Sequence, residues 1–169
     1  NTLAGIASLG GRAAYIGKVR NDALGETFRR DIRKIGVDYR TRAATNGPST
    51  ARCLVIVTPD AQRTMSTYLG VSACLSSEDV DVDAIRASQI TYLEGYLFDP
   101  PEAKKAFFFA AEAAHHAERQ VALSLSDSFC VDRHRAEFLD LIQGHVDILF
   151  ANEEEINALY GTKSFSDSI

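Results

Sequence analysis

The sequence predicts a three-layer α/β/α protein with a mostly parallel sheet, to which a small β-hairpin is attached. From position 76 onward, short apolar segments with β-branched residues alternate with longer segments of helical periodicity. Such alternation implies right-handed crossovers and a parallel sheet covered by helices on both faces. At positions 51–68 the pattern changes, because an apolar, β-branched segment at 51–58 and a second short strand at 62–68 flank a Pro-Asp turn and helices are absent. That segment predicts the hairpin.

The elements before position 76 follow from periodicity and from residues that start or stop helices. Asn1 precedes a segment with apolar residues on one helical face, and its side-chain oxygen is expected to cap that helix. A second, amphipathic segment ends at Gly36, a typical helix stop. The expected elements are helices at 2–9 and 22–35 and strands at 12–19, 51–58 and 62–68.

The elements after position 76 alternate regularly between strand and helix. Pro100-Pro101 opens the longest helix, where missing N–H groups cost little, and Gly161 ends the last one. The expected elements are strands at 89–93, 121–125 and 146–150 and helices at 100–118, 132–143 and 153–160.

Composition and charge exclude several classes of protein. The 169 residues are 46% hydrophobic and 24% charged, which is typical of a globular chain and excludes collagen-like, low-complexity and fully disordered chains. The length predicts one domain, or one large piece of a bigger domain. The net charge is -5 and no basic block occurs, so no nucleic-acid partner is expected. The longest apolar stretch, 106–114, is far shorter than the roughly 20 residues of a membrane-spanning helix, so no membrane association is expected.

The three cysteines indicate a reducing compartment. Cys53, Cys74 and Cys130 are odd in number, widely spaced and without a Cys-x-x-Cys pair, so neither a disulfide framework nor a zinc site is expected. All three are predicted to be reduced, buried thiols of a cytoplasmic protein.

Both ends of the sequence suggest a fragment. The chain opens on Asn1, a helix cap rather than a methionine, and stops shortly after a predicted helix without a closing element. We therefore expect segments before Asn1 and after Ile169 in the parent protein.

Polar residues follow the three predicted strands of the second half. In open α/β sheets, ligands bind beyond the carboxyl ends of the strands, and these ends deliver Glu94, Ser126-Asp127 and Asn152. Taken singly, Ser126, Asp127 and Asn152 are better explained as helix caps than as ligand contacts. No predicted helix begins for several residues after Glu94, so this carboxylate is a candidate acceptor for ligand hydroxyl groups.

The segment Asn152-Glu153-Glu154-Glu155 allows two interpretations. Asn152 and Glu155 are spaced as a capping box, and they also supply the oxygen ligands that Mg²⁺ or its bound waters prefer. The sequence does not separate these interpretations. The histidines lack the spacing of a metal site and are expected on the solvated surface: His115, His116, His134 and His145.

Several of these segments resemble the ribokinase-like (PfkB) family of carbohydrate and nucleoside kinases, over nearly the whole chain. The residues at 1–10, 15–19 and 21–25 resemble the N-terminal signature of the family, and Asn152 to Glu155 resembles its Asn-x-x-Glu motif. The segments 64–70 and 92–96 are most similar to the adenosine-kinase-type branch.

The resemblance implies ATP-dependent phosphoryl transfer to a primary hydroxyl of a nucleoside or sugar. It implies that Asn1 and Glu94 bind the substrate, and that Asn152 and Glu155 organise ATP and Mg²⁺, with Glu155 at the metal. It also implies that the segment of about residues 38–75 includes a β lid that closes over the substrate. The exposed hairpin edge allows a homodimer through the lid.

The chain also departs from the family pattern. It lacks the Gly-Gly pair before Asn1, the preceding strand with a substrate-binding Asp, and the late Gly-Ala-Gly-Asp motif with the catalytic Asp. That base is therefore expected beyond Ile169, and the chain alone is expected to be inactive. Side chains available to a nucleoside base, or equally to core and lid packing, are Tyr68, Leu69, Tyr96 and Phe98.

Three alternatives stay open at this point. The first is a sugar kinase of the ribokinase or fructokinase type, because adenosine and ribose share the hydroxyls that Asn1 and Glu94 would hold. The second is a non-catalytic α/β module that binds a small ligand. A dinucleotide-binding domain fits less well, because Gly10-Gly11 precedes a strand and no Gly-x-Gly-x-x-Gly opens a helix.

Overall fold

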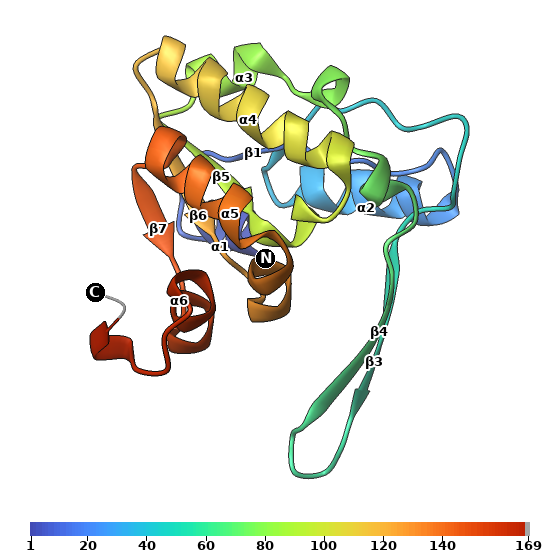
Figure 1. The fold of residues 1–169 in the computed structure, drawn as a ribbon. Coiled ribbons are helices and arrows are strands. Elements are labelled where there is room, and N and C mark those ends of the chain that lie inside the picture. The colour runs from blue at the N-terminus through green and yellow to red at the C-terminus, as the bar shows by residue number, and fades with distance from the viewer. Residues whose placement is uncertain (168–169) are drawn as a thin grey trace. The chain divides into compact units, whose positions relative to one another are not determined.

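The structure is a computed structural model, and it describes residues 1–167. The chain divides into two compact units, Asn1–Leu75 and Ser76–Ile169, which are described separately (Figure 1). Helices and parallel strands occur in both units, which confirms the predicted α/β class.

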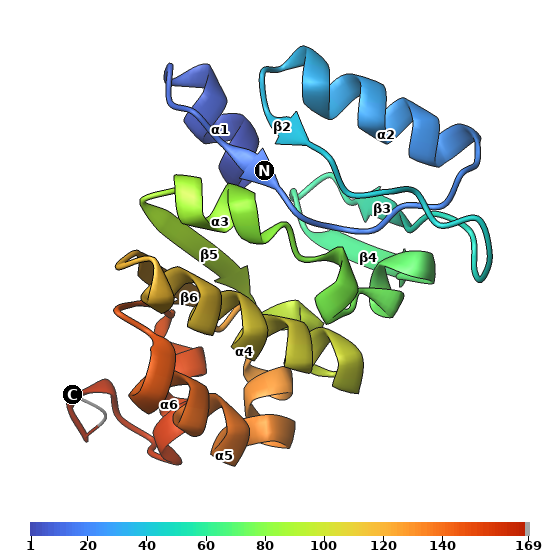
Figure 2. The same ribbon diagram turned by 90° about the horizontal axis from the view of Figure 1, so that it is seen from above.

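The first unit begins with two helices and two very short strands. They are α1 (Thr2–Ser8), β1 (Ala14–Tyr15), α2 (Ala23–Lys34) and β2 (Asp38–Tyr39). β1 and β2 pair in parallel, and Figure 2 shows α2 alongside β2. The strand predicted at 12–19 is therefore too long. One reason is that the Gly17 carbonyl accepts a hydrogen bond from the Tyr39 hydroxyl at 2.8 Å, rather than from a neighbouring strand.

α2 has the ends that its sequence predicts. The side chain of Asp22 accepts the Gly25 N–H at 2.9 Å, and Gly36 follows the helix with a φ of +90°, a left-handed conformation that favours glycine. The aromatic ring of Phe28 packs against Tyr15 and Tyr39, at centroid distances of 5.6 and 5.8 Å. The apolar stripe of α2 thus meets the short parallel strands.

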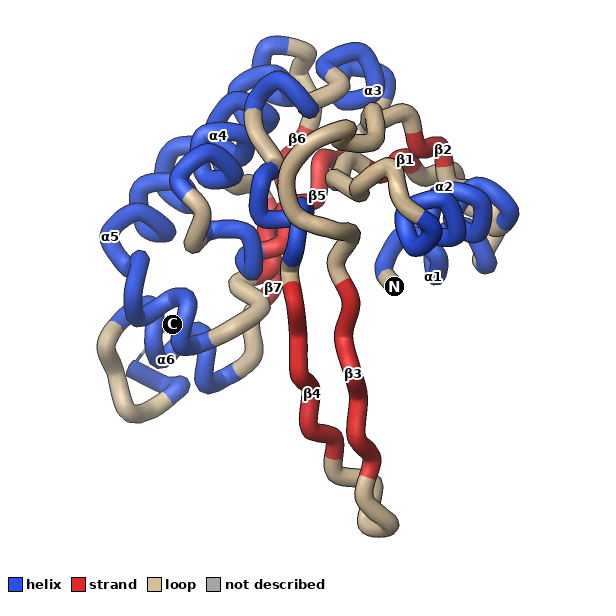
Figure 3. The backbone as a smooth tube through the Cα atoms, turned by 90° about the vertical axis from the view of Figure 1, so that its right-hand side faces the viewer, coloured by secondary structure: helices blue, strands red, loops and turns tan. Residues whose placement is uncertain are grey.

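The predicted hairpin is present as β3 (Arg52–Val57) and β4 (Arg63–Tyr68). The strands pair antiparallel from Arg52 with Tyr68 to Val57 with Arg63, and Figure 3 shows them as a two-stranded ribbon. All twelve residues of the two strands are exposed. Strand formation here therefore comes from pairing and β propensity rather than from burial.

The second unit contains a three-stranded parallel sheet in the order β5-β6-β7. Leu93, Leu123 and Leu149 stand side by side in its register. Figures 1 and 3 both show α4 and α5, the two crossover helices, on one side of this sheet. The elements are α3 (Val82–Ala87), β5 (Ile90–Glu94), α4 (Pro101–His116), β6 (Gln120–Ser124), α5 (Ser128–His145), β7 (Ile148–Phe150) and α6 (Glu153–Tyr160).

Two helices of this unit differ from the sequence prediction. α5 begins at Ser128 rather than near 132, because the Asp127 side chain accepts the Phe129 N–H at 3.1 Å and starts the helix earlier. α3 was not predicted, because its six residues are too few to show a helical period; Asp81 caps it through the Ala84 N–H at 2.9 Å.

The cysteine prediction is wrong for two of the three residues. Cys53 and Cys74 are exposed, and Cys130 is buried. Cys53 lies in the hairpin, where both faces of the strands are exposed, so an apolar sequence pattern there does not imply burial. Among the residues described, no helix is long and apolar enough to cross a membrane.

Candidate functional site

The carboxyl ends of the three parallel strands of the second unit form the candidate site. The register aligns Glu94 of β5 with Ser124 of β6 and Phe150 of β7, so the strands end at one edge. The residues that follow these three positions therefore share that edge, which is called the rim below. Ligands of open α/β sheets bind at this edge.

Glu94 is half-buried at the rim. A short 3₁₀ helix (Gly95–Phe98) begins directly after it, contrary to the expectation that no helix begins for several residues, but the Glu94 side chain makes no capping hydrogen bond. Its Oε2 accepts a hydrogen bond from the Ser126 hydroxyl at 3.0 Å. Within the described residues, its Oε1 has no hydrogen bond. A carboxylate oxygen accepts two hydrogen bonds, so Glu94 retains capacity for ligand hydroxyl groups.

The two polar residues that follow β6 have different tasks. Asp127 caps α5, as the capping interpretation predicts. Ser126 caps no helix, and its hydroxyl bonds to Glu94 and to the Gly95 N–H at 3.1 Å. The capping interpretation is therefore wrong for Ser126, because the cap position falls one residue later.

Asn152 and Glu155 form the capping box of α6. The Asn152 Oδ1 accepts the Glu155 N–H at 2.8 Å, and Glu155 accepts the Asn152 backbone N–H at 3.1 Å and its Nδ2 at 2.9 Å. Glu155 is only 8% exposed. Each Glu155 oxygen keeps a second acceptor position, so the pair fits contacts to Mg²⁺ through the waters that this ion retains. No cluster of three metal-ligating side chains occurs in the part of the chain that the structure describes.

Tyr96 shows that the acidic groups of the rim converge. Burial raises the pKa of its phenol, and the carboxylates of Asp127, Glu94 and Glu155 raise this pKa further. Glu94 ends β5, Asp127 follows β6, and Glu155 lies in the first turn of α6, which follows β7. The region beyond each strand thus contributes one carboxylate near the same phenol. The rim therefore suits a cation together with hydroxyl groups, and it disfavours a bare phosphate.

The predicted substrate residue Asn1 lies in the first unit. It precedes α1 as predicted, but its side chain makes no capping hydrogen bond, so the predicted cap bond is wrong. Backbone N–H groups of the first turn that lack a cap can bind water or a ligand instead. The Asn1 side chain is exposed, which leaves its amide available to a ligand.

Asp22 and Gly25 of the predicted signature have a structural task. The Asp22 carboxylate accepts the Thr50 N–H at 2.9 Å and the Thr50 hydroxyl at 2.7 Å, and these bonds lower the pKa of Asp22. A Cβ at position 25 would collide with the Arg20 carbonyl. The signature therefore attaches the start of α2 to the chain that leads into the hairpin.

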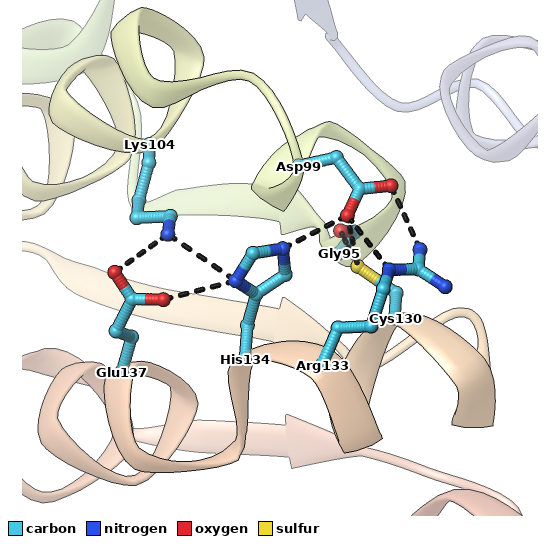
Figure 4. Close-up of polar contacts among 7 residues, drawn as sticks. All are labelled: Gly95, Asp99, Lys104, Cys130, Arg133, His134 and Glu137. Carbon is cyan, nitrogen blue, oxygen red and sulfur yellow. Dashed lines mark hydrogen bonds and ion pairs between the residues drawn. The ribbon is translucent and has the colours of Figure 1, made fainter.

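A cluster of charged side chains supports the turn that follows Glu94 (Figure 4). Asp99 binds Arg133 at 2.8 and 3.1 Å and His134 Nε2 at 2.8 Å. The guanidinium of Arg133 is the main cause of a lowered pKa at Asp99. His134 also contacts Glu137 at 3.0 Å, and Lys104 binds Glu137 at 2.6 Å. The cluster joins the turn after β5 to α5.

One prediction in this region is wrong, for His134, and the structure decides between the two alternatives stated for Phe98 in favour of core packing. His134 is not a solvated surface histidine, because its side chain is only 20% exposed and both ring nitrogens face carboxylates. Phe98 is not available to a ligand, because it is fully buried and stacks on Phe138 at 4.0 Å. The helices that cover these positions are distant in sequence, so neither environment follows from the local pattern.

Comparison with known proteins identifies the family. The family described as "pfkB family carbohydrate kinase" matches residues 1–169 of this chain. The chain belongs to this family.

Similar solved structures extend the comparison. The crystal structure of an adenosine kinase from Sinorhizobium meliloti is 53% identical, with a TM-score of 0.94 over 99% of this chain and 52% of that chain. A probable sugar kinase from Rhizobium etli is 50% identical, with a TM-score of 0.94 over 99% of this chain and 51% of that one.

A curated relative, the probable chloroplastic fructokinase-6 of Arabidopsis thaliana, is 29% identical over 100% of this chain and 46% of its own length. This PfkB chain thus spans about half the length of such relatives.

Proposed function

We propose that the complete gene product is an ATP-dependent kinase that phosphorylates a primary hydroxyl of a nucleoside, with adenosine as the first candidate. The observation that carries the chemistry is the rim, where Glu94 keeps an unused oxygen on the same edge of the sheet as the Asn152–Glu155 pair. The 53% identity to the Sinorhizobium meliloti adenosine kinase supports the nucleoside class.

In this proposal, Asn1 and Glu94 bind the acceptor. The Asn1 amide can donate to and accept from substrate hydroxyls, and the Glu94 Oε1 accepts from one of them. Both residues orient the acceptor so that its primary hydroxyl faces the phosphoryl group. Positioning of this kind supplies much of the catalysis of phosphoryl transfer.

Asn152 and Glu155 organise the phosphate side of the reaction. Mg-ATP supplies the phosphoryl group, and its cation supplies positive charge next to the acidic rim. Glu155 is held by Asn152 in one orientation, and its remaining acceptor positions would accept hydrogen bonds from waters of the ion. The catalytic base belongs, in this proposal, to sequence beyond Ile169.

The hairpin β3–β4 acts as the lid and as a dimer contact. Its exposed apolar side chains include Leu54 at 69% and Ile56 at 64% exposure. Covering such groups with substrate or a second copy removes apolar surface from water. Ile56→Lys is expected to shift the complete gene product from dimer to monomer in sedimentation experiments; a wild-type monomer would contradict the dimer contact.

A sugar kinase is the second candidate, because curated relatives at 24–29% identity carry the name fructokinase. A cytoplasmic location stays a prediction, since the name of one relative places it in the chloroplast.

The test is ADP release by the complete gene product with Mg-ATP and a panel of adenosine, other nucleosides, ribose and fructose. Turnover with adenosine alone is expected. Turnover with a sugar alone would keep the kinase and overturn the nucleoside class. Absence of turnover with every acceptor would contradict the proposal and favour a ligand-binding module. The chain of 169 residues alone is expected to release no ADP above background.

A further inference from the structure

Ser126 lies at the centre of a tight turn, in which the Asp127 N–H donates to the Leu125 carbonyl at 2.8 Å. Its φ is +66°, in the left-handed region that non-glycine residues seldom adopt. Glu118 also has a positive φ, of 56°, but it directly follows the end of α4, where a left-handed residue is common. Ser126 follows a strand instead. The turn fixes the backbone of Ser126, whereas the orientation of its hydroxyl depends on a side-chain contact.

The hydroxyl of Ser126 supplies that contact. It accepts the Gly95 N–H at 3.1 Å and lies 3.0 Å from Glu94 Oε2 and 3.1 Å from the Ser124 carbonyl. A hydroxyl has one proton, so at any moment it donates either to Glu94 or to Ser124. The bond to the carboxylate is the stronger of the two, because its acceptor is charged.

The turn after Glu94 allows the end of β5 to lie close to the end of β6. A Cβ at position 95 would collide with the Leu125 carbonyl, so only glycine allows the end of β5 to pass so close to β6. The Gly95 carbonyl is also held, by the Cys130 thiol at 3.6 Å. Both polar backbone groups of Gly95 are therefore fixed. The backbone that carries Glu94 is rigid where its side chain meets Ser126.

We propose that Ser126 is a positioning residue for Glu94 in the phosphoryl-transfer reaction. Its hydroxyl occupies Oε2 and fixes the carboxylate, so that Oε1 is directed to the acceptor hydroxyl. Ser126 itself touches no substrate in this arrangement. The inference rests on the proposed function, because it assumes that Glu94 binds the acceptor.

Two variants of the complete gene product separate the hydroxyl from the backbone. Ser126→Ala and Ser126→Gly both lack the hydroxyl, but glycine adopts the left-handed conformation without strain. Both variants are expected to raise the KM for the acceptor about tenfold, while the KM for ATP changes less than about twofold. Ser88→Ala is the matched control, because the Ser88 hydroxyl bonds the Ala84 carbonyl at the opposite end of β5.

A double variant provides the decisive readout. In a Glu94→Gln background, Ser126→Ala is expected to change the acceptor KM little, because the carboxylate that Ser126 positions is already lost. An equal effect in both backgrounds, or unchanged acceptor KM in both single variants of an active enzyme, would overturn the inference while leaving the proposed function intact. A wild-type protein inactive with every acceptor would overturn both together.

Discussion

Strand β3 of the hairpin and the parallel sheet β5–β7 are both rich in apolar residues, but they differ in burial. The hairpin contains Val55 and Ile56, at 50% and 64% exposure, whereas Val121 and Leu123 of β6 are fully buried. Both segments form strands, so β propensity and pairing suffice for the secondary structure. Burial instead depends on whether helices cover the strands. We therefore expect the sheet to carry the stability of its unit and the hairpin to be held mainly by its own pairing.

The largest expected difference between the two regions is the loss of stability when an apolar side chain is truncated. Phe98→Ala removes a fully buried ring stacked on Phe138 and should lower the free energy of unfolding by about 3–5 kcal/mol. Ile56→Ala in the hairpin should change it by less than about 0.5 kcal/mol at concentrations low enough for the protein to be monomeric, because the side chain is then in water. Urea unfolding of the complete gene product measures both. Equal losses would remove the contrast between the two regions.

Thiol reactivity should distinguish the same regions. Burial raises the pKa of Cys130 to about 11, so only about one thiol in a thousand is ionised there at pH 8. Cys53 in the hairpin and Cys74 are exposed and should react with a disulfide reagent at once. Of these three thiols, two are expected to react in the native protein. Cys130 is expected to react only after unfolding. Cys130→Ala should leave the fast phase unchanged; a reduced fast phase in that variant would contradict the assignment.

Helix capping gives a smaller, local contrast between Asn152 and Asn1. Asn152→Ala should lower the free energy of unfolding by about 1 kcal/mol, since it removes the cap of α6, and Asn152→Ser should restore most of it. Asn1→Ala should cost almost nothing, because its side chain makes no cap bond. Thermal unfolding tests this pair. A large loss in the Asn1 variant would show that its amide has a structural task.

The smallest expected effect is an acid sensitivity of the cluster around Asp99. Hydrogen bonds to Arg133 lower the pKa of Asp99, and the bond to Lys104 lowers that of Glu137. A lowered folded-state pKa gives stability that is present above the unfolded-state value, about 4, and is lost as the pH falls through the folded-state value. The stability advantage of wild type over Asp99→Asn should therefore shrink from pH 6 to pH 3. Urea midpoints measure it, and a constant difference would contradict this cause.

The sequence predicts the elements well where local residues determine them. The bounds of α6 are correct, because Asn152, Glu155 and Gly161 mark its two ends. The alignment of Glu94 with the ends of β6 and β7 also follows from sequence, since parallel strands bring their carboxyl ends to one edge.

Properties that depend on distant neighbours were not predictable. The left-handed φ of Ser126 leaves no mark in the sequence, and its bond to Glu94 joins residues 32 positions apart. Phe98 is buried because α5 covers it. Cys53 is exposed because it lies in the hairpin, which no helix of the first unit covers among the described residues.

The most direct test of the proposed acceptor site is the acceptor KM of Glu94→Gln in the complete gene product. Glutamine keeps the size of the side chain and removes its charge. Glu102→Gln, an exposed glutamate paired with Lys105 on α4, is the matched control. We predict that the Glu94 variant raises the KM for the acceptor about 10- to 100-fold with the KM for ATP nearly unchanged. Wild-type kinetics for both substrates in this variant would contradict the assignment of Glu94 to the acceptor.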